Sequence, residues 1–259
     1  MKVRKYKDFD EMFLKLNQEI LTNPYEMLDY TNGILGYMDN IFIACKNWDC
    51  NLDLGKFGYK KNKWPHLLKT YINYEELLKF HERLKTATGL SLTFYFNQKK
   101  VNNGSCLIAI VMSRKDRSYK WNKCNVIYRT TETQRRMAAD LCLVNSFIRE
   151  LPDCCEIERV TFYMAQSYIS AMVINGYYDY FGIPLENLNK EHPWTKCLIN
   201  QHYHNFVPGA RITTYQSMAR MQKMALGIET YEPLLCKDLS IKEFFESKMK
   251  KEKNVSKKV

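Results

Sequence analysis

The sequence predicts an α+β protein built as one large domain. Apolar residues recur at helical spacing over residues 8–21 and 131–151, which is typical of amphipathic helices. Short runs rich in β-branched and aromatic side chains, as expected of strands, lie between them at residues 91–96, 107–112 and 125–128. Strands that follow one another between helices, without an internal repeat, favour a single α+β domain. We place this domain at residues 1–245, with a basic, disordered tail at residues 246–259.

The N-terminal segments are expected to be mainly helical. Asp8 and Glu11 have the spacing of a capping box at the start of the helix over residues 8–21, and an Asn-Pro pair ends it. Residues 25–44 are more apolar and predict a second helical region, interrupted by two glycines. Residues 46–65 combine aromatic residues with glycine, which is typical of a loop.

The middle and C-terminal segments alternate between the two kinds of structure. Asn73 can cap a third helix, with Glu76 completing the box, and Pro152 ends the helix over residues 131–151. Residues 158–164 predict a further strand. The remaining elements are a strand end passing into a helix at 165–181, a helix at 214–226 and an amphipathic segment at 240–248.

Composition narrows the class of protein. Hydrophobic residues make up 46% and aromatic residues 14% of the 259 residues, so the chain can bury a sizeable core. No run of about 18 apolar residues predicts a membrane span, and the N-terminal segment lacks the apolar stretch of a secretory signal. Nine cysteines, an odd number, are not a disulfide framework. We therefore expect free thiols in a reducing cytoplasm.

The formal net charge of +11 has two interpretations. Part of it belongs to the lysine-rich tail, which is expected to be solvated. The other interpretation is attraction to an anion, such as a nucleotide, a polyglutamylated cofactor or nucleic acid.

Three residues whose side chains could take part in a reaction lie on the predicted hairpin and on the helix after it. Cys106 opens the first strand of the hairpin, Arg129 lies at the end of the second, and Asp140 lies in the helix. A cysteine thiolate is a nucleophile when a nearby cation lowers its pKa, and Arg129 is placed to supply that cation. Each residue also has a structural alternative: a buried small thiol, a surface ion pair and a solvated helix carboxylate.

Four segments in this order resemble the thymidylate synthase superfamily, and within it the virus-encoded deoxycytidylate hydroxymethylases. They are SCLIAIVM, similar to the catalytic-cysteine strand, YRTTE, similar to the phosphate motif, AADL at the base-reading position, and FYMAQSY, similar to the Phe-Gly-Asp-Ala-His-x-Tyr segment. A further patch, LGKFGY, is similar to Leu-Gly-Pro-x-Tyr-Gly. The resemblance spans residues 45–180 and not the C-terminal quarter.

This resemblance implies a thymidylate synthase-like fold, with a mixed β-sheet packed with helices, and a homodimer. The implied reaction transfers a one-carbon unit from 5,10-methylenetetrahydrofolate to C5 of a pyrimidine deoxynucleoside monophosphate. Hydroxymethylation of dCMP is the leading expectation. The alternatives are methylation of dUMP or an analogue, and a catalytically silent relative that binds nucleotide or nucleic acid.

The resemblance also assigns roles. Cys106 would attack C6 of the base, Arg129 and Thr130 would bind the phosphate, Glu132 would meet the folate, Asp140 would read the base, and Gln166 and Tyr168 would hold the sugar 3′-hydroxyl. A carboxyl group can accept from the N4 amino group of cytosine and, when protonated, donate to N3. Glu132 could instead cap the following helix, and Tyr168 could be a packing residue.

The chain departs from the family at several positions. No arginine pair precedes the cysteine strand, Ser105 replaces a proline, and Gln166 replaces a histidine. Arg136 replaces a glycine and could compensate as a phosphate ligand, as could Arg135. Glu26 is the best candidate for the general acid. These departures leave room for an altered or lost activity.

No metal is expected from the spacing of the candidate ligands. His202 and His204, with Cys197 upstream, lack a second ligand pair at finger-like spacing. Cys45 and Cys50 do not form a zinc pattern either, and there is no Walker loop or GxGxxG motif.

Overall fold

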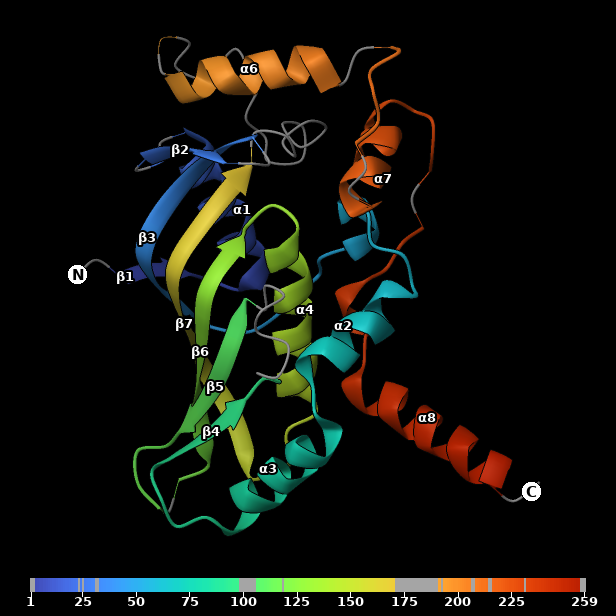
Figure 1. The fold of residues 1–259 in the computed structure, drawn as a ribbon. Coiled ribbons are helices and arrows are strands. Elements are labelled where there is room, and N and C mark those ends of the chain that lie inside the picture. Colours follow the sequence, from blue (N-terminus) through green and yellow to red (C-terminus); the bar gives the residue numbers. More distant parts are fainter. Residues whose placement is uncertain are drawn as a thin grey trace.

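A mixed β-sheet with helices packed on it forms the body of the molecule (Figure 1). The computed structural model describes residues 3–22, 24, 26–30, 33–97, 106–117, 119–170, 191, 193–205, 208–213, 216–230 and 232–256. The α+β class and the mixed sheet packed with helices are therefore confirmed.

The sheet has seven strands in the order β1-β3-β7-β6-β5-β4, with β2 paired to β3 beside this path. The strands are β1 Val3–Tyr6, β2 Glu26–Tyr30, β3 Gly33–Cys45, β4 Ser91–Tyr95, β5 Leu107–Ser113, β6 Trp121–Glu132 and β7 Cys155–Ser170. The pairs β1–β3 and β6–β7 are parallel, and the other pairs are antiparallel. The strands predicted at 91–96, 107–112, 125–128 and 158–164 all lie within or along β4 to β7.

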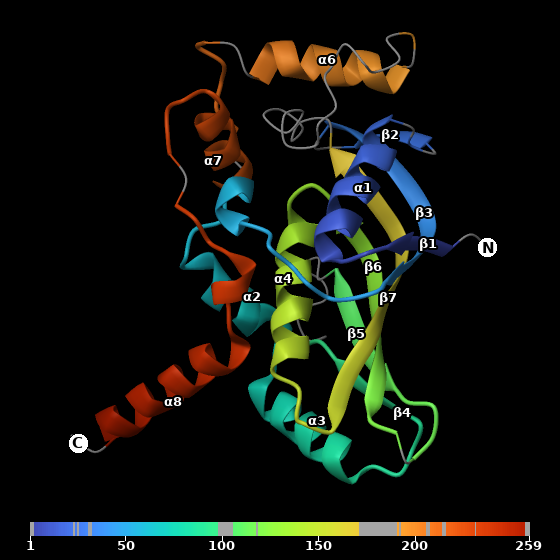
Figure 2. The same ribbon diagram turned by 180° about the vertical axis from the view of Figure 1, so that it is seen from behind.

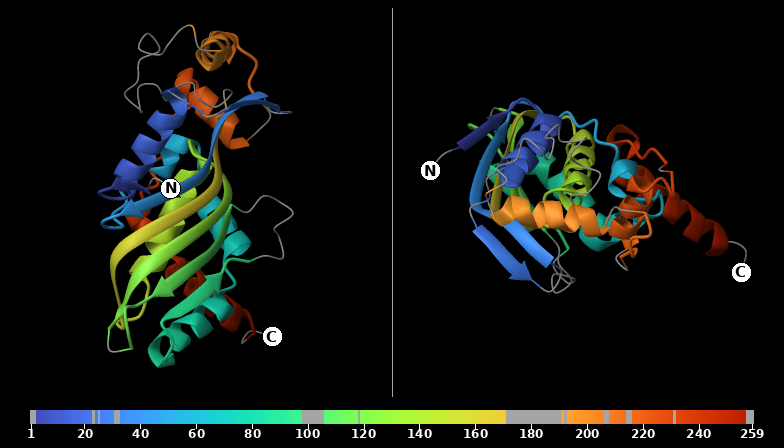
Figure 3. Two further views of the ribbon diagram at one scale, coloured as in Figure 1. Left: turned by 90° about the vertical axis from the view of Figure 1, so that its left-hand side faces the viewer. Right: turned by 90° about the horizontal axis from the view of Figure 1, so that it is seen from above.

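The helices that the structure describes are α1 Phe9–Thr22, α2 Lys63–Tyr71, α3 Tyr74–Thr86, α4 Arg136–Arg149, α6 Pro193–Asn205, α7 Gln216–Ala225 and α8 Ile241–Ser256. Two short 3-10 helices, η1 Leu54–Phe57 and η4 Cys236–Asp238, lie between them. Helices α1 and α4 cover one face of the sheet, as the view from behind shows (Figure 2). The opposite face carries no described helix (Figure 3, left).

The capping signals in the sequence operate as expected. The Glu11 backbone N–H donates to Asp8 Oδ1 at 2.8 Å, and the Lys7 N–H donates to Glu11 Oε2 at 2.6 Å. The Glu76 N–H donates to the Asn73 side chain at the start of α3. These bonds satisfy donors that have no partner within a helix, so both helices begin where the sequence predicts.

Helix α4 is the most enclosed helix described. Every residue from Met137 to Ile148 is buried, so the helix is covered on all sides and not on one face as its amphipathic pattern predicted. The sheet covers one side, and the C-terminal segment covers another: Arg149 donates to the Lys237 carbonyl, and the Ile241 N–H donates to Ser146 and Glu150. The polar residues of α4 are therefore held in a nearly water-free environment.

The helical region predicted at residues 25–44 is wrong. These residues form the antiparallel pair β2–β3, with Glu26 opposite Tyr37. β3 lies between β1 and β7: it pairs with β7 from Leu35 to Cys45, and with β1 over its last four residues, Phe42–Cys45. An apolar run without clear periodicity suits a helix or a buried strand equally, and pairing with neighbouring strands decides between them.

The C-terminal part shows a helix where a tail was expected. The helix predicted at 214–226 is confirmed as α7, but α8 continues to Ser256 although disorder was predicted from residue 246. The ion pair of Lys242 with Glu246, one turn apart, supports the helix across that boundary. Residues 171–181 of the predicted strand-to-helix segment lie outside the described residues. Among the described helices, none has the length and apolar character needed to span a bilayer.

Candidate active site at the β6–α4 turn

Several of the predicted site residues meet where β6 turns into α4. We call this group the Cys106 cluster; it comprises Tyr59, Tyr71, Cys106, Glu132, Arg135, Arg136, Asp140 and Tyr168, which act on one another electrostatically. Cys106 and Asp140 lie far apart in the sequence but contribute to the same buried site because α4 packs against β6, the strand that pairs with β5.

The turn itself is fixed by Glu132. Its Oε1 accepts from the Arg135 backbone N–H at 3.0 Å, and its Oε2 accepts from Arg135 Nε at 3.0 Å. The ion pair is almost fully enclosed, with side-chain exposures of 12% for Arg135 and 4% for Glu132. Glu132 therefore holds the turn that leads into α4 through Arg135, although no side chain caps the helix itself.

Arg136 is the cation beside the Cys106 thiol. The pKa of Cys106 is raised to about 12, mainly by burial and also by the nearby Asp140, although the charge of Arg136 and its hydrogen bond to the sulfur act in the opposite direction. Cys106 is 4% exposed. At neutral pH the thiol consequently holds its proton, and a substrate or a structural change must lower the pKa before a thiolate forms.

Asp140 is linked to Cys106 through Tyr71. The Cys106 N–H donates to the Tyr71 hydroxyl at 3.1 Å, and that hydroxyl is hydrogen-bonded to Asp140. Burial raises the pKa of Asp140 to about 7, against the opposing effects of Arg136 and Tyr71. Asp140 Oδ2 has no hydrogen-bond partner within the described part of the chain. An enclosed carboxyl group of this kind carries a proton about half of the time at neutral pH.

The end of β7 brings Tyr168 and Gln166 alongside β6. Tyr168 lies opposite Glu132, and Gln166 lies opposite Thr130. Burial raises the pKa of Tyr168, and the charge of Glu132 adds to the effect, so the phenol is a neutral hydrogen-bonding group. Thr130 and Gln166 are half-buried at the edge of the cluster.

The side chains of two predicted site residues, Arg129 and Glu26, lie away from the Cys106 sulfur. Alternation along β6 buries Val126 and Tyr128 and leaves Arg129 exposed, although the Arg129 N–H donates to the Cys106 carbonyl at 3.0 Å. Arg136, and not Arg129 as expected, is thus the cation next to the Cys106 thiol. Glu26 is exposed on β2 and accepts from the Tyr37 hydroxyl. Because Tyr37 pairs with Tyr168, Glu26 lies two strands, roughly 10 Å, from the cluster.

Tyr59 and Tyr71 are the cluster members that sequence reasoning did not assign. Burial raises the pKa of both, and Asp140 raises it further. Tyr59 belongs to the LGKFGY patch, which is the signal that could have identified it. Tyr71 ends α2, a helix that the sequence analysis does not predict, so no feature of the sequence identifies Tyr71 as a site residue.

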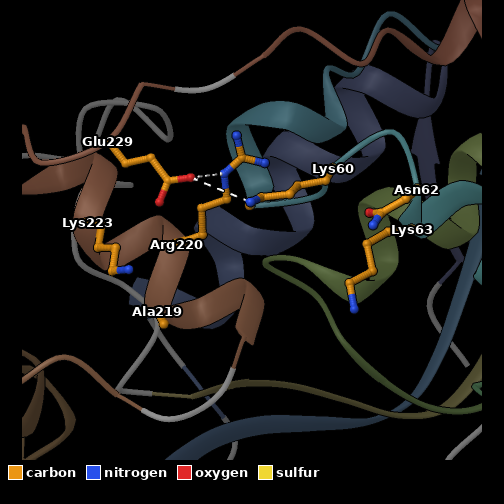
Figure 4. Close-up of a pocket in the computed structure, with 8 residues that line it drawn as sticks. Lys60, Asn62, Lys63, Ala219, Arg220, Lys223 and Glu229 are labelled. Carbon is orange, nitrogen blue, oxygen red and sulfur yellow. Dashed lines mark ion pairs between the residues drawn. The ribbon is translucent and has the colours of Figure 1, made fainter.

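A cationic pocket opens next to Tyr59 (Figure 4). It has a volume of ≈ 550 Å³ and is lined by Gly58, Lys60, Asn62, Lys63, Ala219, Arg220, Lys223 and Glu229. Glu229 Oε1 lies 2.9 Å from Arg220 Nε and 4.0 Å from Lys60 Nζ, and Arg220 Nη1 also donates to the Tyr59 carbonyl. Four basic side chains against one carboxylate leave this pocket positive, which suits an anionic group.

No protein-family model matches the chain, and no curated protein matches it either.

Proposed function

We propose that the protein is a one-carbon transferase with a thymidylate synthase-like fold that acts at C5 of a pyrimidine deoxynucleoside monophosphate, preferably dCMP. The observation that carries this proposal is the meeting of Cys106 with Asp140 and Arg136 in one enclosed cluster. The set combines a thiol for covalent activation, a carboxyl group for the base and a guanidinium for negative charge.

Cys106 would add to C6 of the pyrimidine ring, which makes C5 electron-rich enough to attack a one-carbon electrophile. The thiol proton must leave first, and Arg136 favours that step because its charge stabilises the thiolate. Asp140, whose Oδ2 has no partner within the described residues, would read cytosine with its carboxyl group: the protonated oxygen donates to N3 and the carbonyl oxygen accepts from the N4 amino group. A pKa of about 7 makes the donating form abundant at neutral pH.

The remaining site residues would position the nucleotide. Arg136 is the primary phosphate ligand of this proposal, with Arg129 and Thr130 at the exposed end of β6. Tyr168 and Gln166 would bind the sugar 3′-hydroxyl from β7. Glu26 remains the candidate for the general acid only if β2 approaches the cluster when substrate binds.

The residues near the site fit the glutamate end of 5,10-methylenetetrahydrofolate but not its pterin end. The cationic pocket beside Tyr59 suits the glutamate carboxylates, whereas both oxygens of Glu132 are held by Arg135, so Glu132 is not available to a pterin ring. When bound, the folate would supply the one-carbon unit.

A homodimer is part of the proposal. The sheet face without described helices carries a row of paired residues, Phe42, Tyr163, Ile127, Ala109 and Tyr95, that crosses five strands. Tyr95 is 65% exposed, whereas Phe42, Ile127 and Tyr163 are half-buried and Ala109 is buried. The rings of Phe42 and Tyr163 pack at 4.8 Å. A second copy of the chain would cover this apolar row.

The direct test is tritium release from dCMP and from dUMP labelled at C5, with methylenetetrahydrofolate supplied. We expect release from dCMP and none from the Cys106→Ser variant, whose circular dichroism should match that of the parent. Release from dUMP alone would overturn the assignment of Asp140, and undiminished release in the Cys106→Ser variant would overturn the nucleophile.

A second candidate function is a catalytically silent relative that binds nucleotide or nucleic acid. The raised pKa of Cys106, the distance of Glu26 and the cationic pocket favour it. Such a protein would bind single-stranded DNA with an affinity that falls by orders of magnitude between low and moderate salt. Lys60→Glu with Lys223→Glu should abolish that binding, and Lys79→Glu on α3 is the matched control.

A further inference from the structure

Three buried thiols from distant parts of the chain meet beside α4. Cys50 follows β3, Cys142 lies in the middle of α4, and Cys236 begins η4. Their sulfur atoms all lie within 4.8 Å of one another, and each residue is less than a tenth exposed. No pair of them has the short spacing of a zinc motif in the sequence, so the group arises only from the fold.

Hydrogen-bond donors and a guanidinium lie around the three sulfurs. The Leu52 backbone N–H donates to the Cys50 sulfur, two residues along the chain. The Arg149 guanidinium lies beside Cys236 and donates to its backbone carbonyl at 3.5 Å. Backbone amides and cations placed around thiolates are typical of the outer shell of metal sites.

An oxygen donor completes the set. Asn145 Oδ1 lies 3.5 Å from the Cys236 sulfur, one turn along α4 from Cys142. The Asn145 Nδ2 group donates to the Trp48 carbonyl at 2.8 Å, and this bond directs the amide oxygen toward the thiols. The group therefore presents three sulfur donors and one oxygen donor.

We propose that Cys50, Cys142 and Cys236 form a structural zinc site, with Asn145 Oδ1 or a water molecule as the fourth ligand. Tetrahedral Zn²⁺ with sulfur ligands at about 2.3 Å places the sulfurs about 3.8 Å apart, within the separation that the three thiols already have. Each ligand that is still a thiol releases its proton to solvent when the ion binds. Three thiolates leave the complex with one negative charge, which Arg149 offsets.

The site would join three segments that hydrogen bonds already bring together. The Cys236 N–H donates to the Leu52 carbonyl, and the Leu54 N–H donates to the Leu234 carbonyl. Arg149 of α4 donates to the carbonyls of Lys237 and Leu239. A metal ion at this junction would hold the C-terminal segment against α4 independently of any catalytic activity.

The test is the metal content of the full chain, purified without a polyhistidine tag from cells supplied with zinc. Inductively coupled plasma mass spectrometry should find about one zinc per chain. Cys236→Ser should reduce it to background, and Cys124→Ser, which removes a buried thiol elsewhere, should not. Zinc at background in the parent, or equal zinc in both variants, would overturn the proposal.

A second measurement does not depend on the folding of the variants. Titration of the metal-stripped parent with Co²⁺ should produce a thiolate-to-cobalt absorption band that saturates at about one ion per chain. A disulfide between two of the three cysteines, detected by non-reducing peptide mapping of freshly purified protein, would also overturn the proposal because it removes two of the ligands.

Discussion

Asp140 is a carboxyl group with one oxygen bonded to Tyr71 and the other without a partner in the described residues. Burying such an oxygen is costly unless a ligand completes its hydrogen bonds. The edge of a cytosine ring offers both kinds of partner to a carboxyl group, since the N4 amino group donates a hydrogen bond and N3 accepts one. The same property that makes Asp140 unfavourable in the folded chain therefore makes it suitable for reading a base.

If the protein has the proposed function, Asp140→Asn should shift its preference from cytosine toward uracil. An amide can donate to O4 and accept from N3–H, whereas it loses the protonated carboxyl that serves N3 of cytosine. We expect the ratio of kcat/KM for dCMP over dUMP to fall by about 100-fold or more. Asp153→Asn, on the exposed turn before β7, is the control, and an unchanged ratio in Asp140→Asn would mean that Asp140 does not face the base.

The pKa of Asp140 also has a consequence for stability. It is raised from about 3.9 in an unfolded chain to about 7 in the folded protein. The folded state therefore binds more protons between these values, and the free energy of unfolding should fall as pH rises from about 4 to about 7. Arg136 and Tyr71, which face Asp140, limit the effect.

Urea unfolding of the parent and of Asp140→Asn across this pH window measures the contribution. The variant should lose the part of the slope that belongs to Asp140, at most about 4 kcal/mol over the window. Parallel curves for the two proteins would show that the carboxyl is not protonated preferentially in the folded state.

Substitutions of Arg136 and Arg129 form a matched pair that tests which arginine stabilises the Cys106 thiolate and binds the phosphate. Arg136 acts on the Cys106 sulfur, while the Arg129 side chain is exposed. Arg136→Gln should lower kcat/KM by about 100-fold or more, because it removes the cation that favours the thiolate, and Arg129→Gln should have the smaller effect. The reverse order, measured by steady-state kinetics, would restore Arg129 as the main cation.

How well the site could be predicted depends on whether a residue lies in a regular pattern. The positions of Cys106 and Asp140 on a predicted strand and helix single them out, the family resemblance adds Glu132 and Tyr168, and the structure brings all four together. The exposure of Arg129 follows from alternation along β6, which the sequence showed only in part. Tyr71 and the Glu132–Arg135 pairing depend on how α2 and the turn pack, which one sequence does not reveal.

At the scale of elements, local signals predicted best where a cap defines the start. The helices after Asp8 and Asn73 begin as expected because a side chain satisfies specific backbone donors. The sequence of β2 and β3 predicts a helix because its residues are apolar without a clear period. What makes β3 a strand is its pairing with β1 and β7, which are distant in the sequence.

The α1 cap can be tested directly. Asp8→Ala should lower the free energy of unfolding by about 1 kcal/mol, because the Glu11 N–H loses its acceptor. Glu82→Ala, which removes only an exposed ion pair with Lys85, should change it by less than about 0.5 kcal/mol. Equal effects of the two substitutions in urea unfolding would contradict the capping role.

At the scale of the whole molecule, the sheet has one face covered by α1 and α4 and one without described helices (Figures 2 and 3). An apolar row on an open face is more consistent with an interface than with permanent contact with water. The basic charge of the chain gathers partly in the cationic pocket and not only in the C-terminal segment. The open face of the sheet and the cationic pocket are thus suited to different partners.

Ile127→Glu should convert a dimer into a monomer. Ile127 lies between Ala109 and Tyr163 in the apolar row, so a carboxylate there would be desolvated against its copy. Light scattering coupled to size exclusion measures the mass, and Leu78→Glu, at an exposed site on α3, is the control. A parent that is already monomeric at micromolar concentration would contradict the dimer.

The enclosure of α4 has a consequence for the order of synthesis. Its neighbours include the sheet strands and α1, which emerge early from the ribosome, and η4 with the start of α8, which emerge last. A growing chain would hold α4 half covered until translation is nearly complete, and chaperones would meet an apolar helix during that interval. A stop codon just before residue 232 should therefore yield an aggregating or rapidly degraded product, even though the truncation leaves every strand of the sheet in place.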